Sequence, residues 1–330
     1  MITLPRIKFA LLPTAIEPLP RLSAALGGPR LLVKRDDQTG LAFGGNKTRK
    51  LELLVAEAQA HGARTLVTAG AVQSNHCRQT AGAAARFGLS CILVLTGDQP
   101  DQPTGNVLLD YMLGAELVWG TKSEREQLLQ DTFQAAWDSG RRPYLVPYGG
   151  SSPTGAAAYA LAVQELVEQS REGLLKDSPV DWIVFPSSSG GTQAGMMVGK
   201  RIFGWSGNIL GISVDEPADV LKERVAALAT ATAEKMGEQT IFTPDEVLVN
   251  ADYLGGGYGV MGESEREAIH LFARLEGLLV DPVYTGRAAA GLIGLIRSGF
   301  FSRGETVLFW HTGGTPALFA DKYQSIVTRA

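Results

Sequence analysis

Short apolar runs recur along the chain and alternate with stretches in which apolar residues stand three or four positions apart. The runs are rich in Val, Ile, Leu and aromatic residues, which favours β-strands, and the spaced pattern favours amphipathic helices. The predicted strands cover residues 31–33, 65–68, 92–95, 116–119, 144–146, 182–185, 209–214 and 306–310. This alternation predicts an α/β fold of mostly parallel, twisted sheets with helices on both faces.

Two helices are predicted most clearly. One follows Asn46, ends at Gly62 and carries a single apolar stripe, because four apolar residues fall at i, i+3, i+4 and i+7. That stripe consists of Leu51, Leu54, Val55 and Ala58. The other is expected to begin near Asn75, to run through the small residues 81–85, and to end by Gly88.

The length of 330 residues exceeds the size at which one hydrophobic core usually keeps growing, so we expect two lobes with a ligand cleft between them. No repeat and no linker divides the chain, so the lobes are placed by the motifs described below. We expect a larger lobe of residues 1–48 plus 162–330, a smaller lobe of residues 49–161, and an active site in the cleft.

The charge balance points to a small-molecule ligand. Charged residues make up 19% of the chain and the net charge is −4, so no basic surface favours nucleic acid or an anionic membrane. Cys77 and Cys91 are too few for a disulfide framework or a cysteine zinc site, which fits a reducing, cytoplasmic compartment. Proline and charge interrupt residues 1–8, and no long apolar run follows, so neither export nor a membrane span is expected.

The first candidate for chemistry is the segment GGNKTRK at residues 44–50, with a helix-capping Asn46. Lys47 falls in the first helical turn, where the helix dipole and the cations Arg49 and Lys50 disfavour its ammonium form, so it can serve as a nucleophile. The alternative is a solvated lysine at a helix start. A phosphate-binding loop fits poorly, because Asn46 stands where that motif requires its lysine.

Two further turns lie between a predicted strand and a predicted helix. The turn made by Gln73, Ser74, Asn75 and His76 presents side-chain donors and free backbone N–H groups to an anion such as a substrate carboxylate. An ordinary helix cap is its alternative.

The second of these turns, SSSGGT at residues 187–192, combines hydroxyls, glycines and a helix start, as a phosphate monoester requires. A flexible serine-glycine linker is the alternative, but linkers rarely join a strand directly to a helix.

Three segments that contain glycine occur late in the chain, at residues 255–259, 281–286 and 311–314. Tyr258 and Tyr284 stand in two of them and can stack on a flat cofactor, or serve only in packing. No zinc-binding histidine spacing, no GxSxG elbow and no early GxGxxG is present. Zinc enzymes, α/β-hydrolases and nicotinamide dehydrogenases therefore lack support.

Taken in order, these motifs resemble the D-cysteine desulfhydrase and 1-aminocyclopropane-1-carboxylate deaminase family, over nearly the whole chain. The family consists of pyridoxal-phosphate enzymes of fold type II, the tryptophan synthase β-like fold. The resemblance implies pyridoxal 5′-phosphate as cofactor, a small amino acid as substrate, no metal and a homodimer.

The resemblance also implies roles for individual residues. Lys47 would carry the cofactor as a Schiff base and move the substrate Cα proton, with Ser74, Tyr258 and Tyr284 completing the catalytic set. Asn75 would contact the ring oxygen of the cofactor, and Thr312 its pyridine nitrogen. The phosphate would be bound by Ser188, Ser189, Gly190, Gly191 and Thr192. The substrate would be bound by Gln73, Ser74, Asn75, His76, Tyr258 and Tyr284.

Thr285 departs from the deaminase branch, in which a glutamate contacts the pyridine nitrogen. A carboxylate at about 4 Å and an effective dielectric of about 20 favours ring protonation by roughly 4 kcal/mol, near three pKa units. A threonine hydroxyl cannot supply this stabilisation of the protonated ring. The cofactor ring is then a weaker electron sink, which is suited to expelling a good leaving group.

We therefore expect α,β-elimination, first on D-cysteine, giving pyruvate, ammonia and hydrogen sulfide. L-Cysteate sulfo-lyase, elimination from D-serine or 3-chloro-D-alanine, and the cyclopropane deaminase remain alternatives, as does a non-catalytic amino-acid-binding module.

Overall fold

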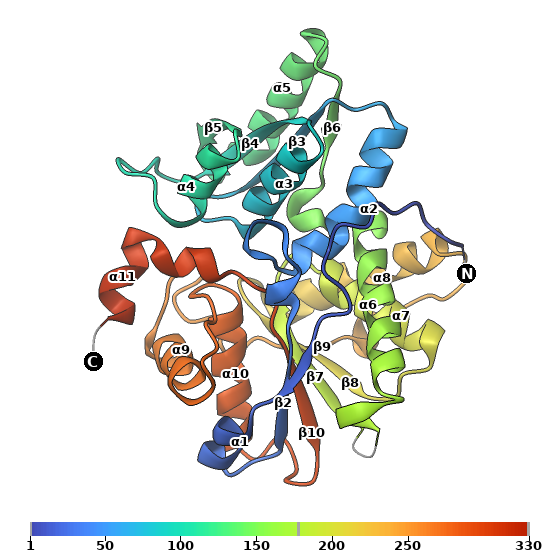
Figure 1. Ribbon diagram of the computed structural model, residues 1–330, viewed down its shortest axis with the longest axis vertical. Helices are drawn as coiled ribbons and strands as arrows, with labels where there is room; N and C mark the ends of the chain where they lie inside the picture. The colour runs from blue at the N-terminus through green and yellow to red at the C-terminus, as the bar shows by residue number, and fades with distance from the viewer. Residues whose placement is uncertain (1, 177–178, 329–330) are drawn as a thin grey trace.

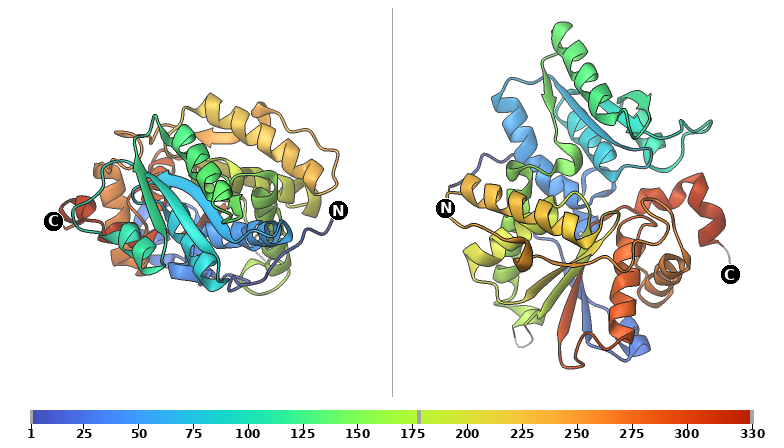
Figure 2. Two further views of the ribbon diagram at one scale, coloured as in Figure 1. Left: turned by 90° about the horizontal axis from the view of Figure 1, so that it is seen from above. Right: turned by 180° about the vertical axis from the view of Figure 1, so that it is seen from behind.

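A computed structural model describes residues 2–176 and 179–328 and divides the chain between two β-sheets. The smaller sheet lies at the top of Figure 1 and the larger at the bottom, with α2 (Asn46–Ala60) running between them. The view from behind in Figure 2 shows the same two-lobed arrangement. The predicted α/β class is confirmed.

The larger sheet has the strand order β1-β2-β10-β7-β8-β9 and is parallel except at β1. Its strands are β1 (Ile16–Pro18), β2 (Arg30–Lys34), β7 (Trp182–Ser187), β8 (Asn208–Ser213), β9 (Leu248–Asn250) and β10 (Thr306–Trp310). Successive residues of β7 enter different cores: Ile183 and Phe185 pack on one face and Val184 on the other. A parallel sheet buried on both faces explains why its strands are continuously apolar.

The smaller sheet is entirely parallel, with the order β5-β4-β3-β6. Its strands are β3 (Thr65–Ala71), β4 (Ser90–Thr96), β5 (Glu116–Gly120) and β6 (Pro143–Leu145). The remaining helices are α1 (Pro20–Leu26), α3 (Asn75–Arg86), α4 (Gly105–Met112), α5 (Arg125–Asp138), α6 (Pro153–Gln169), α7 (Gly191–Phe203), α8 (Ala218–Lys235), α9 (Glu263–Glu276), α10 (Thr285–Arg297) and α11 (Asp321–Val327). Short 3-10 turns are η1 (Asp36–Gln38), η2 (Leu41–Phe43), η3 (Tyr148–Gly150), η4 (Gly173–Leu175), η5 (Pro244–Glu246) and η6 (Thr315–Phe319).

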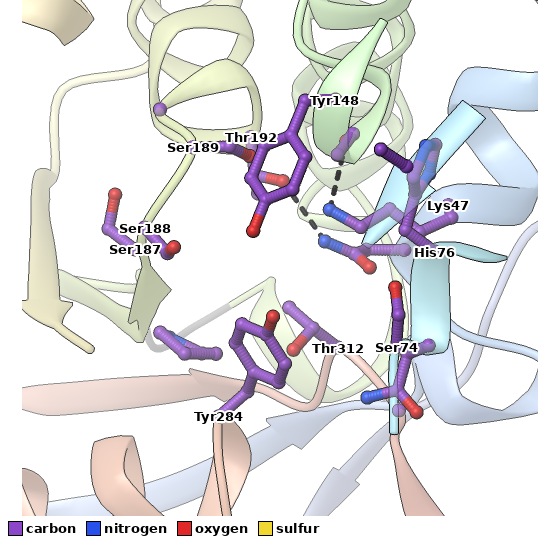
Figure 3. A pocket seen from close by; sticks show the side chains of 17 residues that line it. Lys47, Ser74, His76, Tyr148, Ser187, Ser188, Ser189, Thr192, Tyr284 and Thr312 are labelled. Carbon is purple, nitrogen blue, oxygen red and sulfur yellow. Dashed lines mark hydrogen bonds between the residues drawn. The ribbon is translucent and has the colours of Figure 1, made fainter. Parts of the chain in front are cut away.

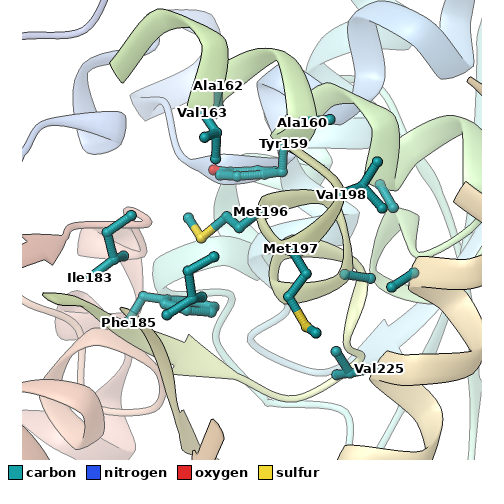
Figure 4. Close-up of a cluster of buried hydrophobic side chains, with 14 of the residues drawn as sticks. Tyr159, Ala160, Ala162, Val163, Ile183, Phe185, Met196, Met197, Val198 and Val225 are labelled. Atoms are coloured by element: carbon teal, nitrogen blue, oxygen red, sulfur yellow. The ribbon is translucent and has the colours of Figure 1, made fainter. Parts of the chain in front are cut away.

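The core beside α6 and α7 shows how tightly the larger lobe is packed. A side chain at Gly195 or Gly199 on α7 would collide with the backbone of α6, so these glycines let the two helices approach closely. Tyr159 and Met196 fill the space above Phe185 in the sheet (Figure 4). This closely packed core supports the amino end of α7 and the turn before it.

All eight predicted strands and both predicted helices are present. The sequence analysis missed β1 and β9, which are three-residue strands at the sheet edges and too short to show a pattern. It was wrong about Asn46 as a cap, because Gly45 is the capping residue and Asn46 is the first helical residue.

Residue 161, the predicted end of the smaller lobe, lies within α6, whose buried residues belong to the core of the larger lobe. We therefore propose that the boundary falls before α6 and keep 1–48 as part of the larger lobe. None of the helices in the described ranges is long and apolar enough to cross a membrane.

Candidate active site

A cavity lies between the two sheets, where strand ends from both lobes meet. β3 leads to Ser74 and β6 to Tyr148, whereas β7 leads to the 187–192 turn and β10 to Thr312. In parallel α/β sheets, ligands bind at these carboxyl ends of strands. Figure 3 shows the lining residues, which are Asn46, Lys47, Ala69, Ser74, Asn75, His76, Tyr148, Gly149, Pro186, Ser187, Ser188, Ser189, Gly190, Thr192, Tyr284, Thr312 and Gly313.

Lys47 reaches this cavity from the first turn of α2. Gly45, two positions before Lys47, has φ 122°, a conformation that suits glycine. The N–H of Gly45 donates to the carbonyl of Asp36 at 2.9 Å. The Lys47 Nζ donates to the carbonyl of Gly149 at 3.0 Å. Burial lowers the pKa of Lys47 to about 8, which leaves part of the amine neutral and nucleophilic near neutral pH.

The basic residue that accompanies Lys47 is Lys50, not Arg49. Burial lowers the pKa of Lys47, whereas the contact with Lys50 raises it, so the predicted effect of Lys50 is not observed. Arg49 points away and forms ion pairs with Asp36 at 2.8 Å and Glu165 at 2.9 Å, so the predicted influence of Arg49 on Lys47 is not observed. Lys50 is fully buried and donates to the same Gly149 carbonyl at 3.1 Å. Burial, and then the charge of Lys47, hold the pKa of Lys50 well below its usual value.

The 187–192 turn forms another wall of the cavity, at the amino end of α7. Gly190 adopts φ 84°, and Gly191 donates its N–H to the Ser151 hydroxyl at 3.2 Å. That hydroxyl also lies 2.7 Å from the hydroxyl of Ser189. Hydroxyls, backbone N–H groups and the positive helix end therefore converge on one point.

The amide of Asn46 joins the Lys47 turn to the 187–192 turn, because its Nδ2 donates to the Thr192 hydroxyl at 3.1 Å. Gly191 itself is not part of the cavity wall and takes part in the turn only through its backbone.

The Ser74 turn is both a helix cap and a wall of the cavity. The Ser74 hydroxyl accepts a hydrogen bond from the Cys77 N–H at 3.1 Å, so Ser74 caps α3 as the alternative interpretation predicted. Ser74, Asn75 and His76 also line the cavity. Gln73 differs, because its amide donates to the carbonyl of Thr104 at 3.0 Å and it does not line the cavity.

His76 is a neutral imidazole whose tautomer follows from its neighbours. The Thr68 hydroxyl donates to the carbonyl of Val146 at 2.8 Å, so it can only accept from His76 Nε2 at 2.9 Å. The hydrogen therefore resides on Nε2, and Nδ1, which is buried and has no partner among residues 2–176 and 179–328, is a bare acceptor. Burial, and then the charges of Lys47 and Lys50, keep the pKa of His76 well below its usual value.

Tyr284 lines the cavity, and its loop is organised by the buried carboxylate of Asp281. That carboxylate accepts the N–H groups of Val283, Tyr284 and Thr285 at 3.0, 3.0 and 2.6 Å. The hydroxyl of Thr285 donates to it at 2.7 Å, so Thr285 is turned away from the cavity and does not line it. Tyr258 lies behind Tyr284 and contacts the cavity only through it, with 2.6 Å between their phenol oxygens.

The sequence analysis missed several residues of this site. Tyr148 and Gly149 belong to the link between β6 and α6, about a hundred positions from Lys47 along the chain. Their Tyr-Gly-Gly-Ser sequence directly after a predicted strand was the available signal. Tyr148 projects across the cavity in Figure 3, and its ring is covered by the guanidinium of Arg125 at 4.5 Å.

Comparison with known proteins agrees with this geometry. A family model described as pyridoxal-phosphate dependent enzyme matches residues 7–313. The chain belongs to this family. D-cysteine desulfhydrases of Salmonella typhimurium and Salmonella typhi are each 41% identical to it over 322 residues, 96% of this chain and 96% of theirs.

A solved structure described as an ACC deaminase homologue is 36% identical, with a TM-score of 0.87. The match covers 98% of this chain and 96% of that one. The family resemblance and the fold type II architecture predicted from the sequence are confirmed.

This pyridoxal-phosphate enzyme has a cavity whose donors fit its cofactor. A buried lysine suits an aldehyde, and the 187–192 turn with Lys50 nearby suits a phosphate dianion. Among the residues described as lining the cavity there is no carboxylate to repel that phosphate. The Ser187 hydroxyl is buried, has no partner in the part of the chain that the structure describes, and remains available to a bound group.

Proposed function

We propose that this pyridoxal-phosphate enzyme is a carbon-sulfur lyase that converts D-cysteine and water into pyruvate, ammonia and hydrogen sulfide. The observation that supports it most is Lys47, a buried amine in a cavity that offers a phosphate turn and no acid among its described lining residues. The 41% identical D-cysteine desulfhydrases support the choice of substrate.

Lys47 would hold the cofactor, and the 187–192 turn would hold its phosphate. The phosphate donors are Ser188, Ser189, Gly190, Gly191 and Thr192, with the Lys50 amine beside Gly191. Asn75 would donate to the ring oxygen, and Thr312 would lie near the pyridine nitrogen. The bound cofactor supplies an electron-withdrawing ring that stabilises negative charge on the substrate Cα.

Lys47 would also move the proton of the substrate Cα. Its pKa of about 8 lets the amine accept that proton and return one near neutral pH. The carbonyl of Gly149 holds the Nζ at 3.0 Å, so the amine stays inside the cavity when it is not bound to the cofactor. Anchoring of the phosphate and the carboxylate at separate turns would orient the Cα–H bond.

The substrate carboxylate would lie at the amino end of α3. The Ser74 side chain and the free backbone N–H groups of Asn75 and His76 offer donors there, reinforced by the helix dipole. The neutral His76 side chain presents an acceptor, so we assign its contribution to the backbone. The Gln73 side chain is bound to the start of α4, so we assign it to support of the turn.

The leaving group would depart beside Tyr284. Burial, and then the neighbouring phenol Tyr258, keep the pKa of Tyr284 well above its usual value, so it stays protonated and can donate to a thiolate. Tyr258 lies within 2.6 Å and can supply the next proton.

The lining of the cavity also bears on the alternative substrates. Lys47 is the one charged side chain among the described lining residues, which suits a thiol better than the sulfonate of L-cysteate. Without a carboxylate at the ring nitrogen, elimination is favoured over opening of a cyclopropane ring.

The enzyme acts on an amino acid, and we propose that it does so in the cytoplasm as a homodimer. Two free, buried thiols, Cys77 and Cys91, are compatible with a reducing compartment. The homodimer is supported by the family resemblance.

The decisive experiment measures pyruvate formed from D-cysteine, L-cysteate and 1-aminocyclopropane-1-carboxylate by the same preparation. We expect D-cysteine to give the highest kcat/KM, with hydrogen sulfide released in equal amount. Faster turnover of either competitor would overturn the substrate assignment.

The role of Lys47 is tested with Lys47→Ala, compared with Lys8→Ala, which changes an exposed lysine. The wild type and Lys8→Ala should be yellow with pyridoxal phosphate, lose that colour with borohydride, and keep the label on Lys47. Full turnover by Lys47→Ala would refute the role of Lys47, and a colourless wild type without turnover would refute the function and leave the binding-module alternative.

A further inference from the structure

The side-chain amide of Asn75 is held in one orientation by two buried residues. Its Oδ1 accepts from Arg78 Nη1 at 3.1 Å and from Asn106 Nδ2 at 2.9 Å. Arg78 and Asn106 are fully buried, and Asn75 lines the cavity at the start of α3. The oxygen end of this amide is therefore occupied by protein donors.

The orientation follows from which atoms can donate. A guanidinium has only N–H groups, so the Asn75 atom that faces Arg78 must be the oxygen. Arg78 Nη1 also donates to the Oδ1 of Asn106 at 2.7 Å, which leaves the Nδ2 of Asn106 as the donor to Asn75. Turning either amide round would place N–H against N–H.

The start of α4 holds Asn106 in place. Its backbone N–H donates to Gln73 Oε1 at 2.7 Å, and its Nδ2 donates to the carbonyl of Gln73 at 2.9 Å. Gly105 before it has φ 58°, and a Cβ there would collide with the Gln73 side chain. Arg78 Nη2 reaches the carbonyl of Gly44 at 2.9 Å, next to the Lys47 turn.

The nitrogen end of the Asn75 amide has no hydrogen-bond partner in the described part of the chain, and Nδ2 is not enclosed by protein. We propose that Arg78 and Asn106 are positioning residues that present the Nδ2 of Asn75 to the ring oxygen of the cofactor. This inference depends on the cofactor placement in the proposed function. We call the pair the Arg78–Asn106 clamp.

The chemical consequence of the clamp is the charge of that ring oxygen. A hydrogen-bond donor stabilises an anionic oxygen, whereas an amide oxygen in the same position would require the ring oxygen to carry a hydrogen. Arg78 adds positive charge on the same side: burial lowers its pKa, but the nearby carboxyls of Asp110 and Asp281 raise it, and burial raises the pKa of Asp110 well above its usual value. The clamp thus favours the anionic, yellow form of the bound cofactor over the neutral form that absorbs in the near ultraviolet.

The test uses the cofactor-loaded enzyme and its absorption spectrum, with Asn106→Leu and Asn106→Asp as the main variants. Asn106→Leu removes one donor to Asn75, and Asn106→Asp replaces that donor with an acceptor of the same shape. We expect the yellow band to fall relative to the near-ultraviolet band in both, with the larger change in Asn106→Asp. Loss of one well-aligned hydrogen bond should raise the Kd for pyridoxal phosphate by about tenfold.

Two further variants separate positioning from general damage. If Asn106 acts through Asn75, then Asn106→Leu should change neither the spectrum nor the Kd further in an Asn75→Ala background. Thr80→Val changes a buried polar residue of α3, the helix that carries Asn75 and Arg78. The Thr80 hydroxyl donates to the His76 carbonyl and to no other described group, so this variant should keep the wild-type spectrum.

The proposal is overturned if Asn106→Leu and Asn106→Asp keep the wild-type band ratio, or if their effects persist in full without the Asn75 amide. A larger spectral change in Asn106→Leu than in Asn106→Asp also contradicts it, because shape rather than donor direction would then matter. A wild type that binds no pyridoxal phosphate would instead refute the proposed function, so the two failures are distinguishable.

Discussion

The phenol oxygens of Tyr258 and Tyr284 lie 2.6 Å apart, with their rings edge to face and 5.8 Å between centroids. Only one of the two hydrogens can lie between the oxygens, so the other is free to point elsewhere. Burial raises the pKa of each phenol well above its usual value, which keeps both hydrogens in place at working pH. Tyr284 lines the cavity and Tyr258 stands behind it, so we propose that the pair forms a two-step proton path to the leaving group.

This arrangement predicts that Tyr284→Phe will be selective for the leaving group. Elimination of a thiolate gains from proton donation, and loss of such a donor lowers kcat by about a hundredfold or more. Chloride leaves without a proton, so kcat for 3-chloro-D-alanine should change far less. The measurement is the ratio of the two kcat values in the wild type and in Tyr284→Phe.

Tyr258→Phe should show the same preference with a smaller loss, because Tyr284 keeps its own hydroxyl. The Tyr258→Phe, Tyr284→Phe double variant should resemble Tyr284→Phe alone. Equal losses with both substrates would contradict a role in proton donation and indicate only packing.

A second prediction concerns the pH dependence of cofactor capture. Capture needs the neutral amine of Lys47, and the neutral fraction rises as pH rises through the pKa of about 8. The rate at which cofactor-free enzyme turns yellow should therefore rise with pH and level off above that value. Free Nα-acetyl-lysine, with a pKa of about 10.4, is the control. A midpoint for the enzyme near that of the free amine would show that burial does not tune Lys47.

The parts of this site that could be predicted are those carried by neighbouring residues in the chain. The Lys47 and 187–192 motifs each lie within one turn, so their position between strand and helix was visible in the sequence. Gly149 and Lys50 join the site only through tertiary contacts, as the shared carbonyl of Gly149 shows. From the sequence, Arg49 and Lys50 were equally good candidates for the cation beside Lys47. Arg49 points away from the cavity because it forms ion pairs with Asp36 and Glu165, which are distant in the sequence.

A third prediction separates the effect of Lys50 on the stability of the cofactor-free protein from its effect on cofactor affinity. This amine is buried without an acidic partner in the described part of the protein, which disfavours folding until an anion binds beside it. Lys50→Met should stabilise the cofactor-free protein by about 1 kcal/mol and raise the Kd for pyridoxal phosphate by about tenfold to a hundredfold. Thermal melts with and without cofactor measure both.

Lys222→Met, a change on α8 in the larger lobe, serves as the control and should leave both quantities near those of the wild type. A cofactor-free Lys50→Met protein that is less stable than the wild type, with unchanged affinity, would mean that Lys50 serves packing and not the phosphate.

The last prediction concerns the buried ion pairs that anchor α2 behind Lys47. Arg49 donates to both oxygens of Asp36, at 2.8 and 2.9 Å, and to Glu165 at 2.9 Å. Tyr159 donates to Asp36 at 2.6 Å, and Lys34 to Glu165 at 2.6 Å. Although burial opposes it, the charge of Arg49 lowers the pKa of the Asp36 carboxyl, and hydrogen bonds with Arg49 lower that of Glu165.

Arg49→Met leaves the Asp36 carboxylate buried with too few partners and should cost about 3 kcal/mol of stability at pH 7. Carboxyls with lowered pKa values stabilise the wild type above about pH 4, and this contribution is lost as pH falls through their folded pKa values. In the variant, Asp36 can take up a proton and shed its charge, so the stability difference should shrink with acidification. Urea unfolding between about pH 4 and about pH 8 measures it.

Arg201→Met, which breaks an exposed pair with Glu246, is the matched control and should change stability by at most about 1 kcal/mol at every pH. If Arg49→Met lowers the free energy of unfolding as little as this control does, and by the same amount at every pH, then the buried ion pairs do not hold α2 in place. A loss that grows as pH falls would contradict the lowered pKa of Asp36, because protonation must relieve an unpaired carboxylate.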